Sequence, residues 1–161
     1  MKLRALALRY VERYATSEAK LVRYLSRKIY ERGWEGERAA TPEDLAREFV
    51  RLGYVDDAAL AEAKARASIR KGHGSKRLGQ DLHFAGISEQ DSAGAMDDAK
   101  ENAWAAAQNF ARKRRIGPYA EHNADPDKRH KQLQAFLRAG HNFDTARRFV
   151  DAKPGALLEE D

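Results

Sequence analysis

Hydrophobic residues recur along this chain at the three- and four-residue spacing that places them on one face of an α-helix. In the first segment, residues 3–15, this spacing places Leu3, Ala7, Tyr10 and Tyr14 on a single face. No segment alternates apolar and polar residues convincingly enough to be interpreted as a strand. The pattern predicts an all-α protein.

Helix-capping residues predict where the next two helices begin. Ser17 can accept a hydrogen bond from an unpaired backbone N–H at the start of the second helix. The third helix is expected to start at Thr41-Pro42, because the threonine can cap it in the same way and proline at the first helical position needs no donor. Phe49 and Leu52 are then expected to face the core until the helix stops at Gly53.

One sequence pattern ends three of the expected helices. The segment Phe49-Val50-Arg51-Leu52-Gly53-Tyr54 is echoed at residues 82–87 and 136–141, with glycine in the fifth place of each copy. Glycine is expected there because the residue that stops such a helix adopts a positive φ. The residue after it can pack back on the helix. A capping residue for the next helix follows each copy: Asp56, Ser88 and Asn142.

These copies divide the chain into tandem units. We expect three three-helix repeats at residues 1–55, 56–100 and 101–151, followed by an acidic flexible tail at residues 152–161. Each repeat resembles a helix-turn-helix module but is too short to bury a large core alone. The prediction is therefore about nine helices, in three helix-turn-helix-like repeats that stack as an elongated, solenoid-like array.

Charged residues are segregated along the chain. The net charge is +5, from 30 Lys and Arg against 25 Asp and Glu. The basic residues concentrate in residues 1–32, 63–86 and 102–150, whereas acidic residues predominate between these blocks and in the tail. Basic faces that meet a polyanion are one explanation. The other is that helical proteins often show blocky charge by chance.

The composition excludes several classes of protein. There is no cysteine, which removes disulfides, cysteine-based zinc sites and a cysteine nucleophile. No run approaches the roughly 18 uncharged apolar residues of a membrane span. Charges throughout residues 1–14 leave no apolar core for a signal peptide. We expect a cytoplasmic monomer that contacts no membrane.

Motifs with possible chemistry have simpler explanations. The adjacent carboxylates Asp56-Asp57 and Asp97-Asp98 point apart on a helix, so we interpret them as caps and first-turn charges. Ser17-Glu18-Ala19-Lys20 has the Ser-x-x-Lys spacing of some acyl enzymes, but the other motifs of that class are absent. Gly72-His73-Gly74-Ser75 could offer backbone N–H groups to one phosphate, but it lacks the Lys-Ser/Thr of a P-loop, so we favour a linker over a phosphate contact. The five histidines include no His-x-x-x-His pair, so no metal site is expected.

Three groups of residues resemble the RecX family of recombinase regulators, in the order in which the family has them. The resemblance spans nearly the whole chain, although Leu60, Ala85, Ala139 and His141 depart from the family pattern. The groups are Gly53-Tyr54-Val55-Asp56-Asp57 with Leu60-Ala61, Arg70-Lys71-Gly72-His73-Gly74 leading through Arg77-Leu78 and Leu82 to Gly86-Ile87, and Phe136-Leu137-Arg138-Ala139-Gly140 with Phe143-Asp144.

The resemblance implies a non-enzymatic regulator of homologous recombination and DNA repair, of the kind that acts in the SOS response. Such a protein lies along the groove of a RecA-DNA filament. It modulates RecA ATPase, filament assembly and strand exchange, with inhibition as the expected direction, and needs no cofactor. Residues of the family motifs are expected to be structural: Gly53, Tyr54, Asp56, Asp57, Gly72, Gly86, Ile87, Phe136 and Gly140.

Three basic clusters are the candidate contacts with DNA or with the filament. Cations at the end of a helix, as at residues 112–115, are favoured by the macrodipole without any ligand. Cations at a helix start, as at residues 128–131, are disfavoured, so anion binding is their simplest explanation. Tyr54 and Trp104 could stack on bases but are interpreted as core residues. The candidates are Arg66, Arg70, Lys71, Lys76, Arg77, Lys113, Arg114, Arg115, Lys128, Arg129 and Lys131.

Two functions remain open from the sequence, and a third, an α-helical enzyme, has only scattered carboxylates in its support. In the first, basic faces of the repeats contact single- or double-stranded DNA in the RecA filament, and the acidic blocks face a basic surface of the recombinase. The alternative is a helix-turn-helix transcription regulator that binds DNA. Such regulators usually dimerise to read paired half-sites, and this sequence has no obvious dimerisation helix.

Overall fold

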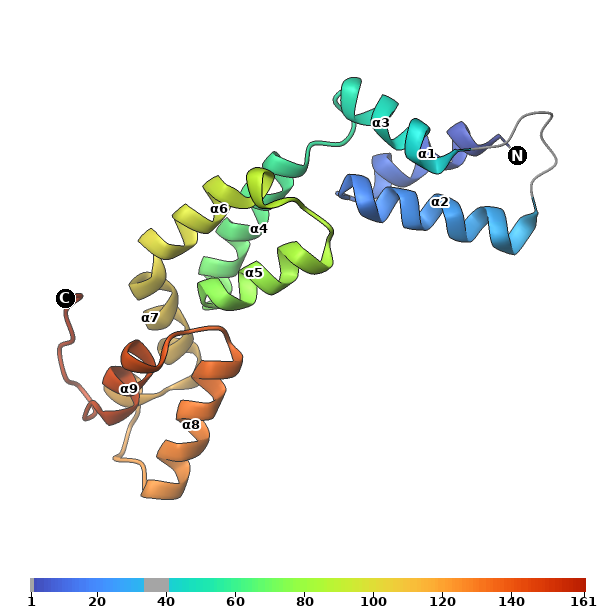
Figure 1. Cartoon of the computed structure of the whole chain (residues 1–161). Helices are drawn as coiled ribbons and strands as arrows, with labels where there is room; N and C mark the ends of the chain where they lie inside the picture. The colour runs from blue at the N-terminus through green and yellow to red at the C-terminus, as the bar shows by residue number, and fades with distance from the viewer. Residues whose placement is uncertain (1, 34–40) are drawn as a thin grey trace. The chain divides into compact units, whose positions relative to one another are not determined.

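The computed structural model describes residues 2–33 and 41–161 (Figure 1). Within these ranges all regular structure is helical, as predicted, and none of the helices is both long and apolar enough to cross a membrane. A short 3-10 helix, η1 (Gly117–Tyr119), precedes α8. The α-helices are α1 (Leu3–Arg13), α2 (Glu18–Arg32), α3 (Pro42–Arg51), α4 (Asp57–Lys71), α5 (Ser75–Phe84), α6 (Glu89–Glu101), α7 (Ala103–Arg114), α8 (Pro126–Arg138) and α9 (Phe143–Asp151).

The helices form two compact units. Unit 1 comprises Met1–Ala61 and Leu82–Ser92, and unit 2 comprises Glu62–Asp81 and Ala93–Asp161. Helices α4, α5 and α6 each contribute residues to both units. The division into three repeats, expected at residues 1–55, 56–100 and 101–151, stays a prediction.

The core of unit 1 is built from the apolar faces of α1, α2 and α3. Ala7, Leu21, Leu25 and Phe49 are completely buried in it. Leu52, expected in the core, is 45% exposed. It is the residue that caps the end of α3, where the chain leaves the helix and the helical spacing no longer predicts which way a side chain faces.

Both predicted helix starts in unit 1 are correct, but only one of the predicted hydrogen bonds is. The hydroxyl of Ser17 accepts from the backbone N–H of Lys20 at 3.1 Å, as a helix cap does. Helix α3 begins at Pro42 after Thr41. The Thr41 hydroxyl instead donates to the carboxylate of Asp44 in the first turn of the helix.

The core of unit 2 is aromatic. Phe110, Phe136 and Phe149 are buried side chains of α7, α8 and α9. The ring centroids of Phe110 and Phe136 are 4.6 Å apart, and those of Phe136 and Phe149 are 5.9 Å apart. Trp104 packs against this core with its ring centroid 4.7 Å from that of Phe149.

The three predicted glycine stops share one backbone conformation. Gly53, Gly86 and Gly140 have φ angles of 81°, 74° and 96°, in the left-handed region. In each copy the residue after the glycine donates its backbone N–H to the carbonyl of the first residue, at 2.9 to 3.2 Å, as in a Schellman helix end. These donor and acceptor pairs are Tyr54 and Phe49, Ile87 and Leu82, and His141 and Phe136.

The predicted capping residues after the glycine stops are also confirmed. The side chains of Asp56, Ser88 and Asn142 each accept a hydrogen bond from the backbone N–H three residues later, at 3.0, 3.1 and 2.8 Å. The sequence repeat is therefore a repeat of local structure: a helix, a left-handed glycine and a capped helix start.

The residues that follow α9 contact other segments of unit 2, to which they belong. The backbone N–H of Gly155 donates to the carbonyl of Pro118 at 2.9 Å, and Leu158 packs against the aromatic core. Arg148 forms an ion pair with Asp161, 3.3 Å between the two charged groups. The flexibility expected of the tail, residues 152–161, stays a prediction.

Candidate functional site

A cleft of about 340 Å³ in unit 2 is lined by five cationic side chains, which we name the basic cleft. Lys71 is the last residue of α4, Arg77 lies in the first turn of α5, and Arg138 is the last residue of α8. Lys113 and Arg114 end α7. No acidic side chain lines the cleft. None of the five cations forms an ion pair with a carboxylate of residues 2–33 or 41–161.

One backbone junction brings the start of α5 to the end of α8. The N–H of Gly74 donates to the carbonyl of Ala139 at 2.8 Å, and the N–H of Lys76 donates to the carbonyl of Gly140 at 3.3 Å. A side chain on Gly74 would collide with the Gly140 carbonyl, so the two segments can approach this closely only because residue 74 is glycine. The junction places Arg77 and Arg138 on the same cleft.

A second junction holds the end of α4 against α7. The Lys113 ammonium donates to the carbonyl of Arg70 at 2.6 Å, and the Asn109 amide donates to the carbonyl of Ile69 at 3.0 Å. Carbonyls in the last turn of a helix lack partners from their own helix, and side chains of α7 supply them here. Lys71 therefore lies beside the cationic end of α7.

Two histidines adjoin the basic cleft and have low pKa values. Burial, followed by the charges of Arg77 and Lys71, lowers the pKa of His73, which lines the cleft. Burial lowers the pKa of His141, and its Nε2 lies 2.7 Å from the carbonyl oxygen of Gly72. A carbonyl only accepts hydrogen bonds, so Nε2 carries the proton and donates it. His141 thereby ties the third glycine stop to the end of α4.

The arrangement favours the binding of an anion. Five cations without carboxylate partners repel one another, and a phosphate or carboxylate group bound between them would relieve that repulsion. The Arg114 guanidinium lies 5.4 Å from the centre of the Phe110 ring, so this side chain is held partly by an aromatic face rather than by an acid. Its N–H groups stay available to a ligand.

The basic cleft contains four of the basic residues predicted from the sequence and one that sequence reasoning missed. Lys71, Arg77, Lys113 and Arg114 line it as candidates. Arg138 belongs to the third glycine stop, and its place two residues before the glycine is the sequence signal that could have identified it. The remaining candidates are exposed but do not line this cleft, and their contact with DNA stays a prediction: Arg66, Arg70, Lys76, Arg115, Lys128, Arg129 and Lys131.

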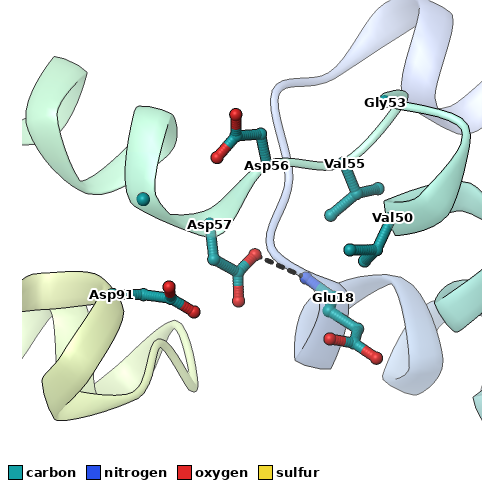
Figure 2. A pocket seen from close by; sticks show the side chains of 8 residues that line it. Glu18, Val50, Gly53, Val55, Asp56, Asp57 and Asp91 are labelled. Carbon is teal, nitrogen blue, oxygen red and sulfur yellow. Dashed lines mark hydrogen bonds between the residues drawn. The ribbon is translucent and has the colours of Figure 1, made fainter.

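A cleft of about 300 Å³ in unit 1 has the opposite charge, and we name it the acidic cleft (Figure 2). Glu18, Asp56, Asp57 and Asp91 line it, and no basic side chain does. Figure 2 shows Asp91 of α6 pointing toward Asp57 of α4. No group of three or more metal-ligating side chains is placed to hold a metal ion in the part of the chain that the structure describes.

The two adjacent aspartates of the acidic cleft have separate structural roles. Asp56 caps its own helix, α4, as predicted. Asp57 accepts from the backbone N–H of Glu18 at 3.0 Å and so caps the start of a different helix, α2. Burial raises the pKa of Asp57 and the Glu18 N–H opposes this effect, while the charges of Asp91 and Asp56 raise the pKa further.

Tyr54, interpreted as a core residue from the sequence, is on the surface of unit 1. It is 54% exposed, and its ring centroid lies 5.3 Å from that of Phe49. The glycine stop turns the ring back on the end of α3, where it covers the outside of the core instead of entering it. Trp104 is partly buried, in agreement with its interpretation.

No protein-family model matches the chain. The chain is similar to "Regulatory protein RecX" of Myxococcus xanthus (strain DK1622), with 31% identity over 156 residues that cover 92% of this chain and 83% of the relative. It is 33% identical to "Regulatory protein RecX" of Agrobacterium fabrum (strain C58 / ATCC 33970) over 107 residues, which cover 66% of this chain and 54% of that relative.

A solved structure supports the fold. The crystal structure of RecX from Lactobacillus salivarius superposes with a TM-score of 0.62 over 92% of each chain, at 16% sequence identity. This likeness confirms the all-α fold, and the curated relatives confirm the resemblance seen in the motifs. Because the match to the Myxococcus protein spans most of both chains, this chain belongs to the RecX family of regulatory proteins, which are not enzymes.

Proposed function

We propose that this protein regulates a RecA recombinase by binding the RecA-DNA filament, and that the basic cleft contacts DNA phosphates there. Bound protein slows filament assembly, ATP turnover and strand exchange. Membership of the RecX family supports the regulatory role. The single observation that supports the DNA contact is the set of five cations without acidic partners in one cleft.

Phosphate is a better fit to this cleft than a protein carboxylate. Nucleic acid presents a continuous row of phosphates with condensed counterions. Each protein cation that binds a phosphate releases counterions, and this release strengthens the contact. Arg77, Arg114 and Arg138 each present a planar fork of N–H donors, which matches the oxygens of a phosphate group. A cleft that binds phosphates reads no base edges, which suits a regulator that must act on any DNA sequence.

The acidic cleft supports a contact with protein. Four carboxylates repel phosphate, so this face of unit 1 avoids DNA and favours a basic surface of the recombinase. The first glycine stop, which contributes Val50 and Gly53 to the lining of this cleft, adds apolar contact area. Its side chains Val50 and Tyr54 are 40% and 54% exposed. Asp91→Lys is expected to weaken inhibition of the recombinase without weakening the binding of bare DNA.

The DNA contact can be tested by charge reversal. We expect the double variant Arg77→Glu/Arg138→Glu to require several-fold more protein than the wild type to inhibit the DNA-dependent ATPase of RecA. Lys100→Glu/Lys153→Glu is the matched control, because it reverses two exposed cations of unit 2 that do not line the cleft. Far-ultraviolet circular dichroism verifies that both variants are folded.

Equal inhibition by the two double variants would contradict the assignment of the basic cleft. If the wild type left both the ATPase and the filament length of RecA unchanged at low salt, the regulatory proposal itself would be wrong. A stable dimer with strong preference among duplex sequences would instead favour the transcription regulator.

A further inference from the structure

A third hollow, of about 470 Å³, lies in unit 1 along α1 and α2 and combines aromatic and cationic side chains. We name it the tyrosine recess. Its lining includes Tyr10, Tyr14 and Tyr24, together with Arg9, Arg13 and Arg27. Lys28 completes the lining, and no acidic side chain takes part in it. None of these residues belongs to the motifs or basic clusters that the sequence singled out for binding.

The three tyrosines form a cluster whose outermost ring, Tyr14, is half exposed. The rings of Tyr10 and Tyr24 are stacked, with centroids 4.1 Å apart and an angle of 17° between their planes. Tyr14 leans on Tyr10, 5.2 Å away and tilted by 48°. Tyr14 is 49% exposed because it follows the last residue of α1 in an extended conformation. The recess therefore holds an aromatic ring that rests on Tyr10 and is half exposed to solvent.

Two arginines of the recess lie over these rings. The Arg13 guanidinium lies 5.5 Å from the centre of the Tyr14 ring, and the Arg27 guanidinium lies 5.8 Å from that of Tyr24. Within the described residues, neither Arg9 nor Arg13 forms an ion pair. Arg27 lies 3.7 Å from Glu31, but the shorter contact of that carboxylate, 2.9 Å, is with Lys28.

A half-exposed aromatic ring beside arginines without ion pairs restricts the ligand. A simple anion or an acidic peptide would use the arginines and leave the exposed part of the Tyr14 ring in water. An apolar ligand would cover the ring and leave the cations uncompensated. A nucleotide satisfies both features, because its base stacks on an aromatic ring and its phosphate binds cations.

We propose that the tyrosine recess binds one nucleotide of a single-stranded nucleic acid, with the base stacked on Tyr14 and the phosphate held by Arg9 and Arg13. A single strand is required because the bases of a duplex stack on one another and offer no free face. The inference goes beyond the proposed function, since it concerns unit 1, a different set of residues and the stacking of a base in addition to phosphate contact.

The test is the binding of a fluorescein-labelled 20-nucleotide oligo(dT) to the full chain, measured by fluorescence anisotropy without recombinase. We expect Tyr14→Ala to weaken binding roughly tenfold to hundredfold, the cost of losing one base-aromatic stack. Tyr14→Trp should bind at least as tightly as the wild type, because indole stacks as well as phenol. Arg9→Gln/Arg13→Gln should reduce both the affinity and its dependence on salt.

Tyr30→Ala is the matched control. Tyr30 belongs to α2 in the same unit and is 91% exposed, but it does not line the recess. Neither Tyr14 nor Tyr30 is a core residue, so both alanine variants are expected to fold. A 20-base-pair duplex should bind equally well to the wild type and to Tyr14→Ala. A labelled oligo(rU) of the same length identifies the preferred sugar. Tighter binding of oligo(dT) would assign the recess to single-stranded DNA, and tighter binding of oligo(rU) would assign it to RNA.

Because the basic cleft could also bind the oligonucleotide, binding at the recess must be measured separately from binding at the cleft. The effect of Tyr14→Ala should persist in the Arg77→Glu/Arg138→Glu background. An oligonucleotide containing 5-iodouracil should form a photo-crosslink to the peptide that contains Tyr14. Crosslinks confined to peptides of unit 2, or equal loss of single-strand binding in Tyr14→Ala and Tyr30→Ala, would overturn the proposal. Displacement of oligo(dT) by poly-glutamate, with Tyr14→Ala binding like the wild type, would assign the arginines to an acidic peptide instead.

Discussion

Asp57, at the start of α4, accepts a hydrogen bond from the backbone N–H of Glu18, at the start of α2, over 3.0 Å. Ser17 precedes Glu18, and its hydroxyl donates to the carbonyl of Ala85. The start of α2 is thus held by α4 on one side and by the second glycine stop on the other. This junction gives Asp57, one of the family-motif residues, a structural role in unit 1.

Removing the Asp57 carboxylate should destabilise the protein. We expect Asp57→Ala to lower the free energy of unfolding by about 1–2 kcal/mol, because the Glu18 N–H loses its partner. Asp57→Asn keeps an oxygen acceptor and should cost much less. Urea unfolding followed by circular dichroism checks both. Equal losses in the two variants would show that the hydrogen bond is not what stabilises this junction.

The raised pKa of Asp57 predicts a pH dependence of stability. A carboxyl group whose pKa is higher in the folded than in the unfolded state favours the folded state most at low pH. That advantage is lost as the pH rises from the ordinary value of 3.8 through the raised value. The stability of the wild type relative to Asp57→Asn should therefore fall as the pH rises above 3.8 and through the raised pKa. Denaturation curves at several acidic pH values measure the difference, and a rise over this interval would contradict the prediction.

Two glycines of unit 2 should respond in opposite ways to alanine. At Gly74 a Cβ would collide with the Gly140 carbonyl, so Gly74→Ala is expected to cost about 1–3 kcal/mol and to open the basic cleft. At Gly94, inside α6, the nearest atom is Glu62 Oε1 at 3.7 Å, an ordinary contact. Gly94→Ala should stabilise the helix by about 0.5–1 kcal/mol. Thermal unfolding distinguishes the two, and a stabilising Gly74→Ala would mean that the junction is not tight.

His141 should make the protein sensitive to acid. Burial lowers the pKa of His141 below its ordinary 6.5, so its contribution to stability is complete above that value. The contribution is lost as the pH falls through the lowered pKa, because the unfolded chain binds the proton more readily. His141→Gln retains an N–H donor for the Gly72 carbonyl but does not titrate, so the loss of stability from pH 7.5 to pH 5 should be smaller in this variant.

His73→Gln is the control for this measurement. The pKa of His73 is also lowered, so this histidine contributes with the same sign, but it is less buried than His141. If His73→Gln reduced the loss of stability at low pH more than His141→Gln does, the pH sensitivity would belong to His73, and the prediction for His141 would be wrong.

Tertiary packing, not local sequence, decides the surroundings of Tyr14 and Arg138. Tyr14 fits the apolar face of the first helix by spacing, yet α1 ends at Arg13 and the ring stays half exposed. Arg138 lies within a recognised motif, but only the contact of Gly74 with the third glycine stop places it beside Arg77. Neither relationship follows from neighbours along the chain.

Helix starts, glycine stops and caps could be predicted because each depends on residues a few positions apart. A capping side chain reaches an N–H three residues away, and the φ of a glycine is a property of one residue. The clefts and the tyrosine recess depend on which helix ends meet, and that choice is made by packing between distant segments. The sequence by itself therefore determined where the helices start and stop, and its motifs indicated the family. Close backbone approaches, such as that of Gly74 to Gly140, determined which charged side chains share a surface.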